Sequence, residues 1–203
     1  PGPHASKECI PLSLLLKEVL TVASSNKEVK KLLIKHQVLV DGRFVSQTGF
    51  PVGLMDVTSI PAIGKHYRLV TVKGILRPVE ITSDQSKTKL CKIVDKTVVK
   101  QGKVQLEFHD GRTLLIEKEE DRFKPGDSLK ISIPKQSIQG FLKLEKGATC
   151  LIYKGKHAGV LATLSHILER EGSKASDAVL SSNGKEYITL KEYLFVVDKE
   201  FKV

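Results

Sequence analysis

Residues 26–45 read NKEVKKLLIKHQVLVDGRFV and predict a short helix joined directly to a tight β-hairpin. At about 100° per residue, Val29, Leu32 and Leu33 share one face of this helix. Four lysines fall on the opposite side, with one apolar residue, Ile34, beside them. These lysines are Lys27, Lys30, Lys31 and Lys35. The stretch therefore predicts an apolar face packed on a core and a basic face turned outward.

The neighbouring segments complete a small module. We expect a first helix to begin at Pro11 and Asn26 to cap the second. After residues 38–40, which predict a strand, Asp41-Gly42 is a strong hairpin signal. Any soluble helix has a polar face, so a solvated surface is the simpler interpretation of the lysines when they are considered alone.

Composition favours a polyanionic partner. The chain has 203 residues, a formal charge of +10 and 40% hydrophobic residues, which is enough for two or three small domains with their own cores. Nucleic acid, an anionic membrane and an acidic protein all fit this charge. No run of 18 apolar residues exists, so no membrane span is predicted. Residues 61–147 carry 18 Lys+Arg against 11 Asp+Glu, so most of the excess charge lies in the middle of the chain.

Residue patterns for catalysis or metal binding are weak. Cys9, Cys91 and Cys150 stand far apart without a CxxC pair, which predicts neither a disulfide framework nor a zinc site and fits a reducing compartment. The six histidines form no HExxH motif, and GKHAG lacks the spacing of a P-loop. We therefore predict no catalytic residue, no metal, no cofactor and no small-molecule substrate.

From residue 67 onward the sequence predicts short strands. Asp110-Gly111 and Asn183-Gly184 each separate two alternating apolar runs, as hairpin turns do. A strand at 148–153 leads into the loop 154–159, and residues 165–177 are expected to form a polar excursion. Strands of this length and spacing are typical of small barrels or sandwiches.

Several motifs together resemble one family. Residues 12–60 are similar to the alpha-L RNA-binding module, and the loop KGKHAG, with Gly159 at its glycine position, resembles a KOW motif. The order PGPHxxxECxPL, alpha-L module, GFPVGLMDVxSI, a β-rich centre with KLCKI and a KOW unit resembles the archaeal and eukaryotic small-ribosomal-subunit protein family "S-four-e". The resemblance covers nearly the whole chain, but not the basic N-terminal segment and C-terminal extension that members usually carry.

The resemblance implies an α+β, mostly β, fold in three parts. These are an alpha-L module of two helices and a small sheet within 1–60, a central β-barrel-like basic domain at 61–145, and a KOW or SH3-like barrel at 146–203. The implied role is a structural constituent of the small ribosomal subunit that binds folded rRNA. Low aromatic content, 5%, fits phosphate and shape recognition better than single-strand stacking.

The implied partners are rRNA of the small subunit and neighbouring ribosomal proteins, in the cytoplasm, with nucleolar assembly if the source is eukaryotic. The acidic run 117–121 is expected to face solvent or a basic protein neighbour. Two alternatives remain open from the sequence: a KOW-bearing transcription or translation factor, and the substrate-binding portion of an RNA-modifying enzyme.

Twelve residues are the predicted RNA contacts. His36 is expected either to cap the end of its helix or to touch RNA, and the run 87–92 is by default a solvated strand edge. The full set is Lys27, Lys30, Lys31, Lys35, His36, Arg43, Lys87, Lys89, Lys92, Lys154, Lys156 and His157.

Overall fold

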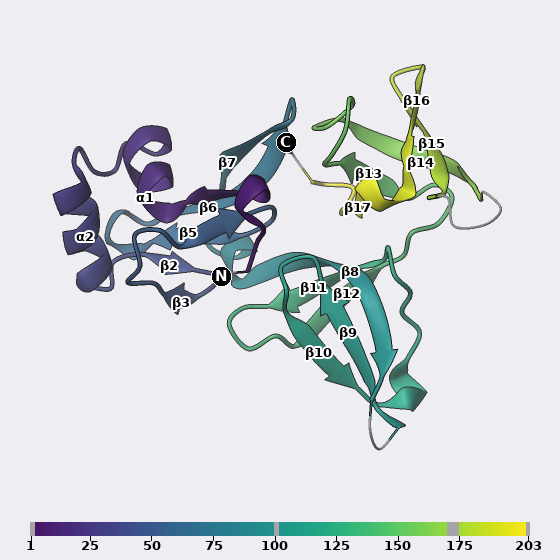
Figure 1. The fold of residues 1–203 in the computed structure, drawn as a ribbon, viewed down its shortest axis with the longest axis horizontal. Coiled ribbons are helices and arrows are strands. Elements are labelled where there is room, and N and C mark those ends of the chain that lie inside the picture. Colours follow the sequence, from purple (N-terminus) through teal and green to yellow (C-terminus); the bar gives the residue numbers. More distant parts are fainter. Residues whose placement is uncertain (1–2, 100–101, 170–174, 202–203) are drawn as a thin grey trace. The chain divides into compact units, whose positions relative to one another are not determined.

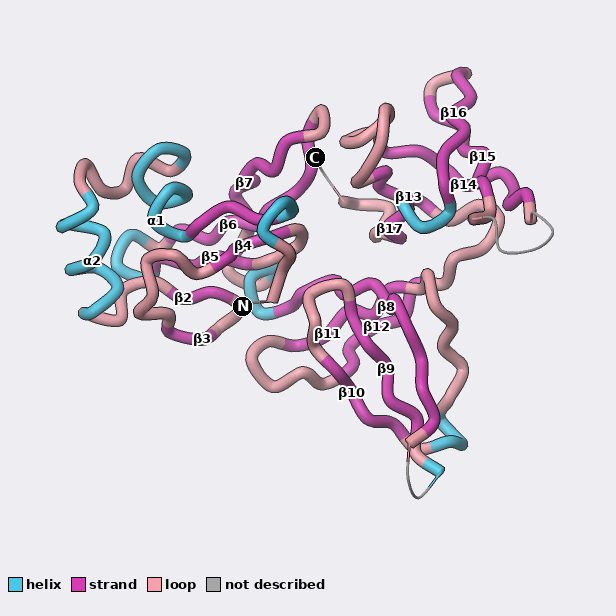
Figure 2. Tube along the Cα trace, in the orientation of Figure 1, coloured by secondary structure: helices cyan, strands magenta, loops and turns pink. Residues whose placement is uncertain are grey.

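The computed structural model describes residues 3–99, 102–169 and 175–201, and strands dominate it (Figure 1). Figure 2 shows helix only in α1, α2 and a few short turns within this described part. The prediction of an α+β, mostly β, chain is therefore confirmed. The chain divides into two compact units. Unit 1 comprises Pro1–Val70, Leu76–Lys89 and Ile131–Ile138, and unit 2 comprises Thr71–Ile75, Leu90–Lys130 and Gln139–Val203.

The first sheet has the strand order β3-β2-β5-β6-β7 in the described residues. It extends beyond residue 60, because β6 pairs antiparallel with β5. A smaller sheet pairs β1 with β4. The strands of these two sheets are β1 (Cys9–Pro11), β2 (Leu39–Val40), β3 (Arg43–Phe44), β4 (Pro51–Gly53), β5 (Val57–Ile60), β6 (Lys65–Val72) and β7 (Ile75–Ile81).

Two helices pack on this sheet through their apolar faces (Figure 1). α1 (Leu12–Leu14) begins one residue after the predicted start at Pro11, which is its N-cap, and continues as a π-helical turn, Leu15–Val19. α2 spans Asn26–Ile34. Its N-cap is Ser25 and not Asn26 as predicted, because the Ser25 hydroxyl accepts the Glu28 backbone N–H at 3.3 Å.

The core of this module comes from the expected apolar residues. Val29 and Leu33 of α2 are fully buried, and Leu32 is half-buried beside them. They pack in one cluster with Leu12 and Leu15 of the first helix. The predicted amphipathic arrangement of α2 is therefore confirmed, and burial of these side chains holds the helix in a fixed orientation on the sheet.

The second sheet has the strand order β10-β9-β8-β11-β12 in the described residues. The hairpin predicted around Asp110-Gly111 is present, with Thr113 of β10 paired to Glu107 of β9. The strands are β8 (Thr88–Val98), β9 (Val104–Phe108), β10 (Thr113–Ile116), β11 (Ser128–Ser132) and β12 (Ile138–Leu142).

The third sheet has the strand order β16-β15-β14-β13-β17 in the part of the chain described. The hairpin at Asn183-Gly184 joins β15 to β16 as predicted. The expected polar excursion at 165–177 is partly wrong, because β14 continues through Leu168; residues 170–174 lie outside the described part. The strands are β13 (Thr149–Ile152), β14 (Leu161–Leu168), β15 (Asp177–Ser182), β16 (Lys185–Leu190) and β17 (Leu194–Val196).

Short 3-10 turns connect several of these strands; they are Ser6–Glu8, Pro61–Ile63, Gln85–Lys87, Lys118–Glu120 and Lys191–Tyr193. Across the described ranges, no helix combines the length and the apolar character needed to cross a bilayer.

Candidate nucleic-acid interface

The basic face of α2 lies open to solvent. Its four predicted lysines, Lys27, Lys30, Lys31 and Lys35, are all exposed. Because Val29 and Leu33 anchor the other side of the helix, the lysines extend from a backbone that is already fixed. The helix thus presents a row of ammonium groups on a backbone that needs no further ordering.

The end of α2 adds an aromatic contact to this face. His36 adopts a positive φ of 52°, and its backbone N–H donates to the Leu33 carbonyl at 3.1 Å. Its ring lies 5.2 Å from the ring of Phe44. Phe44 is 59% exposed and follows Arg43, also exposed, on β3. The structure therefore brings His36 and Arg43 to the same end of the module, beside the exposed ring of Phe44, which is not among the predicted RNA contacts.

The hairpin turn at Asp41-Gly42 has a second role that the sequence did not reveal. Both residues have positive φ, 50° and 74°, as this kind of turn requires. The Asp41 carboxylate is buried: it accepts the Val57 backbone N–H at 2.9 Å and lies 2.8 Å from Lys89 Nζ. Asp41 is therefore both a turn residue and a buried counter-charge.

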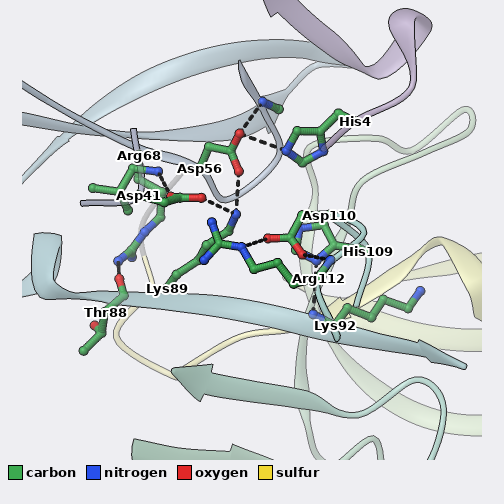
Figure 3. Close-up of polar contacts among 12 residues, drawn as sticks. His4, Asp41, Asp56, Arg68, Thr88, Lys89, Lys92, His109, Asp110 and Arg112 are labelled. Carbon is green, nitrogen blue, oxygen red and sulfur yellow. Dashed lines mark hydrogen bonds and ion pairs between the residues drawn. The ribbon is translucent and has the colours of Figure 1, made fainter. Parts of the chain in front are cut away.

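Lys89 lies at the centre of a buried ionic cluster (Figure 3). Its side chain is fully buried, and Nζ donates to Asp41 at 2.8 Å and to Asp56 at 2.5 Å. Asp56 also accepts the Gly53 backbone N–H and His4 Nε2–H, each at 2.8 Å. Burial opposes ionisation of Asp56, but the charge of Lys89 and the hydrogen bond from His4 hold its pKa well below the usual range.

The expectation of a solvated strand edge at 87–92 is wrong for two of its lysines. Lys89 is enclosed by two carboxylates, so its ammonium group cannot reach an RNA phosphate in this structure, and we remove it from the RNA contacts. Lys92 is 5% exposed. Lys87 is the exception: it is exposed and pairs with Asp84 at 2.8 Å.

A second buried charge cluster lies in unit 2. His109 Nδ1 accepts the Lys92 backbone N–H at 3.3 Å, and Arg112 Nε lies 3.0 Å from the Asp110 carboxylate. The ligand atoms of Cys91, His109 and Asp110 fall within 4.8 Å of one another, as metal ligands would. Because the ring nitrogen and the carboxylate are already engaged by protein groups, we interpret this cluster as structural.

The loop Lys154–Gly159 joins β13 to β14 as a tight turn. Gly155 and Gly159 have φ of 81° and 97°, as predicted for glycines that take conformations closed to other residues. A side chain at Gly159 would collide with the backbone of Val72 and Lys73. The loop is therefore held close to another segment of unit 2, and glycine is required there.

The three predicted contacts of this loop differ in exposure. Lys156 is exposed. His157 is half-buried, and its ring packs against Tyr187 at 5.2 Å. Lys154 is half-buried, with Nζ 5.4 Å from the centroid of the Tyr153 ring. The loop thus offers one fully solvated cation, with two partly enclosed groups beside it.

The chain is similar to known proteins of one ribosomal family. The model of ribosomal family S4e matches residues 63–138. The small ribosomal subunit protein eS4 of Methanothermobacter thermautotrophicus is 39% identical over 207 residues, covering 100% of this chain and 84% of that protein. Its counterpart from Methanocaldococcus jannaschii is 41% identical over 210 residues, covering 98% and 84%.

The same similarity extends to a solved structure. The crystal structure of the 30S ribosomal protein S4e from Thermoplasma acidophilum superposes with a TM-score of 0.80 at 28% sequence identity. The match covers 95% of this chain and 96% of that one. The likeness therefore extends over nearly the whole of both folds.

Proposed function

Because the chain belongs to the ribosomal S4e family, it is a structural constituent of the small ribosomal subunit and not an enzyme, and we propose that it binds folded rRNA at several separate surfaces. Three segments contribute: α2 with its hairpin, the exposed Lys87, and the loop Lys154–Gly159 of a KOW-like barrel. Each contact is weak alone, and their linkage in one chain raises the effective concentration of the others. Under the predicted division at 1–60, 61–145 and 146–203, each of the three parts carries one of these RNA contacts.

The exposed lysine face of α2 is the observation that carries this proposal. Lys27, Lys30, Lys31 and Lys35 point away from a buried apolar face, and phosphate contacts of this kind supply affinity that does not depend on base sequence. Arg43 and His36 extend the surface at the end of the helix, where the exposed ring of Phe44 can lie against an unpaired base.

The loop Lys154–Gly159 would form a second, compact RNA contact. Its glycines allow a tight turn, and Lys156 is fully solvated at its tip. Little backbone conformational entropy remains to be lost when such a loop contacts RNA. His157 and Lys154 stand beside it and would add a hydrogen bond and a second charge.

Neighbouring ribosomal proteins are the second class of partner. Glu119 and Glu120 are exposed, whereas Glu117 and Asp121 pair with Lys103 and Lys96, each at 2.8 Å. A basic segment of another subunit protein would complement the two exposed carboxylates. The chain would act on the ribosome in the cytoplasm and, in a eukaryotic cell, would join the assembling subunit in the nucleolus.

Charge reversal on α2 tests the RNA-binding surface. We expect Lys30→Glu/Lys31→Glu to lower affinity for small-subunit rRNA about 10–100-fold, and to reduce the slope of log K against log salt by about 0.9 for each phosphate that the variant no longer neutralises. Fluorescence anisotropy with labelled rRNA, repeated at several salt concentrations, measures both quantities. The matched control, Lys118→Glu/Lys185→Glu, changes net charge equally at two exposed lysines outside the proposed surface.

Comparison of the two double variants distinguishes a defined RNA contact on α2 from a general attraction between the basic chain and RNA. Equal loss of affinity in both double variants would mean that only net charge matters, and would remove α2 as a defined site. For the wild-type chain, about six phosphate contacts would lower the binding constant roughly a thousandfold between 50 and 200 mM salt. Sedimentation of native small subunits in moderately high salt is a further test. Recovery of the protein in stoichiometric amount would show that it is a permanent component of the subunit.

A further inference from the structure

A cavity of about 470 Å³ lies within unit 2 and was not indicated by the sequence. It is lined by Lys92 of β8, by Tyr153 and Lys154 after β13, and by the turn Lys191–Tyr193. Its volume falls within the range of about 300–1,000 Å³ that is usual for small-ligand sites. The cavity is therefore large enough to hold a nucleotide and not only a single ion.

The walls carry three ammonium groups and one carboxylate. Lys92 is buried, Lys154 and Lys191 are half-buried, and Glu192, among the described lining residues, is the one acidic side chain. Glu192 is exposed, so its charge is well hydrated and only partly compensates Lys92 and Lys191. The cavity thus concentrates positive charge where water is partly excluded.

The pKa of Lys92 reflects this excess of positive charge. Burial is the main cause that lowers its pKa to about 8. Of the groups that face it, Glu192 and Cys150 act to raise the pKa, whereas Lys154 and Lys191 lower it further. The site therefore holds a cation that lacks a sufficient counter-charge, and an anion placed beside it would relieve both the burial penalty and the repulsion.

The hydrogen bonds leave room for such an anion. Lys92 Nζ donates to the backbone carbonyl of Glu192 at 2.5 Å, and within the described residues this is the one acceptor recorded for it, although an ammonium group has three donors. The Tyr153 hydroxyl donates to the same carbonyl at 3.1 Å. The Tyr153 ring lies 5.1 Å from Lys92 Nζ and 5.4 Å from Lys154 Nζ, which holds two like charges near one another.

We propose that this cavity binds one nucleotide of an RNA strand, with its phosphate between Lys92, Lys154 and Lys191. The proposal rests on the proposed rRNA-binding function and gives it a defined pocket. RNA is favoured over a free anion because Lys154 begins the loop Lys154–Gly159, whose exposed Lys156 is a proposed phosphate contact. A strand that follows this loop would carry its next phosphate into the cavity, while the Tyr193 ring, packed over Gly155, forms an aromatic wall for the base.

Two variants of the full-length chain test the pocket. Lys92→Met removes the buried charge but keeps most of the side-chain volume, and Lys191→Gln removes a charge at the wall without changing the core. For each we expect about a tenfold loss of affinity for small-subunit rRNA, and a salt slope reduced by about 0.7–0.9. Lys191→Arg should restore the slope, and Lys185→Gln, at an exposed position outside the cavity, should leave both values unchanged.

Three probes identify the ligand. A five-nucleotide single-stranded RNA, adenosine monophosphate and inorganic phosphate are each titrated while NMR follows the Lys92 side-chain resonance. We expect the RNA to raise the Lys92 pKa at concentrations at least tenfold below those needed for the other two, and its binding to weaken above pH 8 as free Lys92 loses its proton. Equal effects of all three probes would identify a general anion site and overturn the proposal.

The result also separates the pocket from the function on which it rests. If the wild-type chain binds rRNA and the two pocket variants bind with the same affinity and salt slope, the pocket is wrong and the rRNA-binding function stands. If the wild-type chain does not bind rRNA, both are wrong. Should Lys92→Met fail to fold by circular dichroism, Lys191→Gln and its arginine rescue decide the question alone.

Discussion

The lysines of α2 and those of β8 look alike in sequence and have opposite environments. On α2, Lys30 and Lys31 are exposed because the helical period places Val29, Leu32 and Leu33 on the other side; Ile34, which is 60% exposed, is the one apolar residue of the helix beside them. On β8, residues 89 to 93 are all buried, so neither face of the strand is open to solvent at that point. A run of lysines therefore indicates a solvent-exposed surface only where the periodicity of its helix or strand, and the elements packed on it, leave the lysines uncovered.

The electrostatic consequence differs as well. An exposed lysine contributes little to folding and can give its full charge to a polyanion. Lys89 instead compensates two buried carboxylates, Asp41 and Asp56. It belongs to the fold of unit 1, and its loss should be seen in stability before it is seen in RNA binding.

The sharpest test of this contrast is removal of the Lys89 charge. We expect Lys89→Met to lower the free energy of unfolding by about 3–5 kcal/mol, because Asp41 and Asp56 would remain buried without the cation between them. Urea denaturation followed by circular dichroism measures this change. Lys30→Met, the matched substitution on α2, should change stability by less than about 0.5 kcal/mol.

A triple variant shows whether the loss is electrostatic. Lys89→Met combined with Asp41→Asn and Asp56→Asn removes the stranded charges, and should recover part of the lost stability. If the triple variant is less stable than Lys89→Met alone, the carboxylates contribute mainly through their hydrogen bonds to backbone N–H groups, and the ionic account of the cluster is wrong.

A smaller effect is expected from the pH dependence of Lys92. Its pKa is lowered to about 8 in the folded chain, whereas an unfolded lysine titrates near 10.4. Between these values the unfolded state binds more protons, so stability must rise with pH. We expect the wild-type chain without RNA to gain roughly 2 kcal/mol from pH 8 to pH 10 relative to Lys92→Met. Parallel pH profiles of the two proteins would contradict the depressed pKa.

Local periodicity predicted most of the fold. The α2 face, the hairpins at Asp41-Gly42, Asp110-Gly111 and Asn183-Gly184, and most strands follow from apolar spacing and turn residues. These features depend on residues close together in the chain, where steric rules act directly. The extension of β14 through Leu168 was missed because two successive polar residues, Ser165 and His166, and a register shift between Leu164 and His166 interrupt the alternation of the strand.

The interior charges could not be predicted in the same way. Lys89 meets Asp41 and Asp56 across 48 and 33 residues, and nothing local marks such a pairing. One signal was present: in a strand, Lys89 alternates onto the same face as Cys91 and Ile93, both apolar. A lysine on an apolar strand face indicates a buried partner, and this would have separated Lys89 from the solvated lysines.

The smallest effect concerns the scaffold that presents the α2 lysines. We expect Ser25→Ala to cost about 1 kcal/mol, because the hydroxyl caps the helix by accepting the Glu28 N–H. Ser24→Ala is the matched control, since Ser24 engages the Glu28 carboxylate through its backbone N–H, at 2.7 Å, which alanine keeps. Thermal unfolding compares the two variants. If both lose equal stability, the hydroxyl cap is not what holds the first turn of α2; if only Ser25→Ala does, the exposed lysine row depends on a local cap, whereas buried Lys89 depends on long-range pairing.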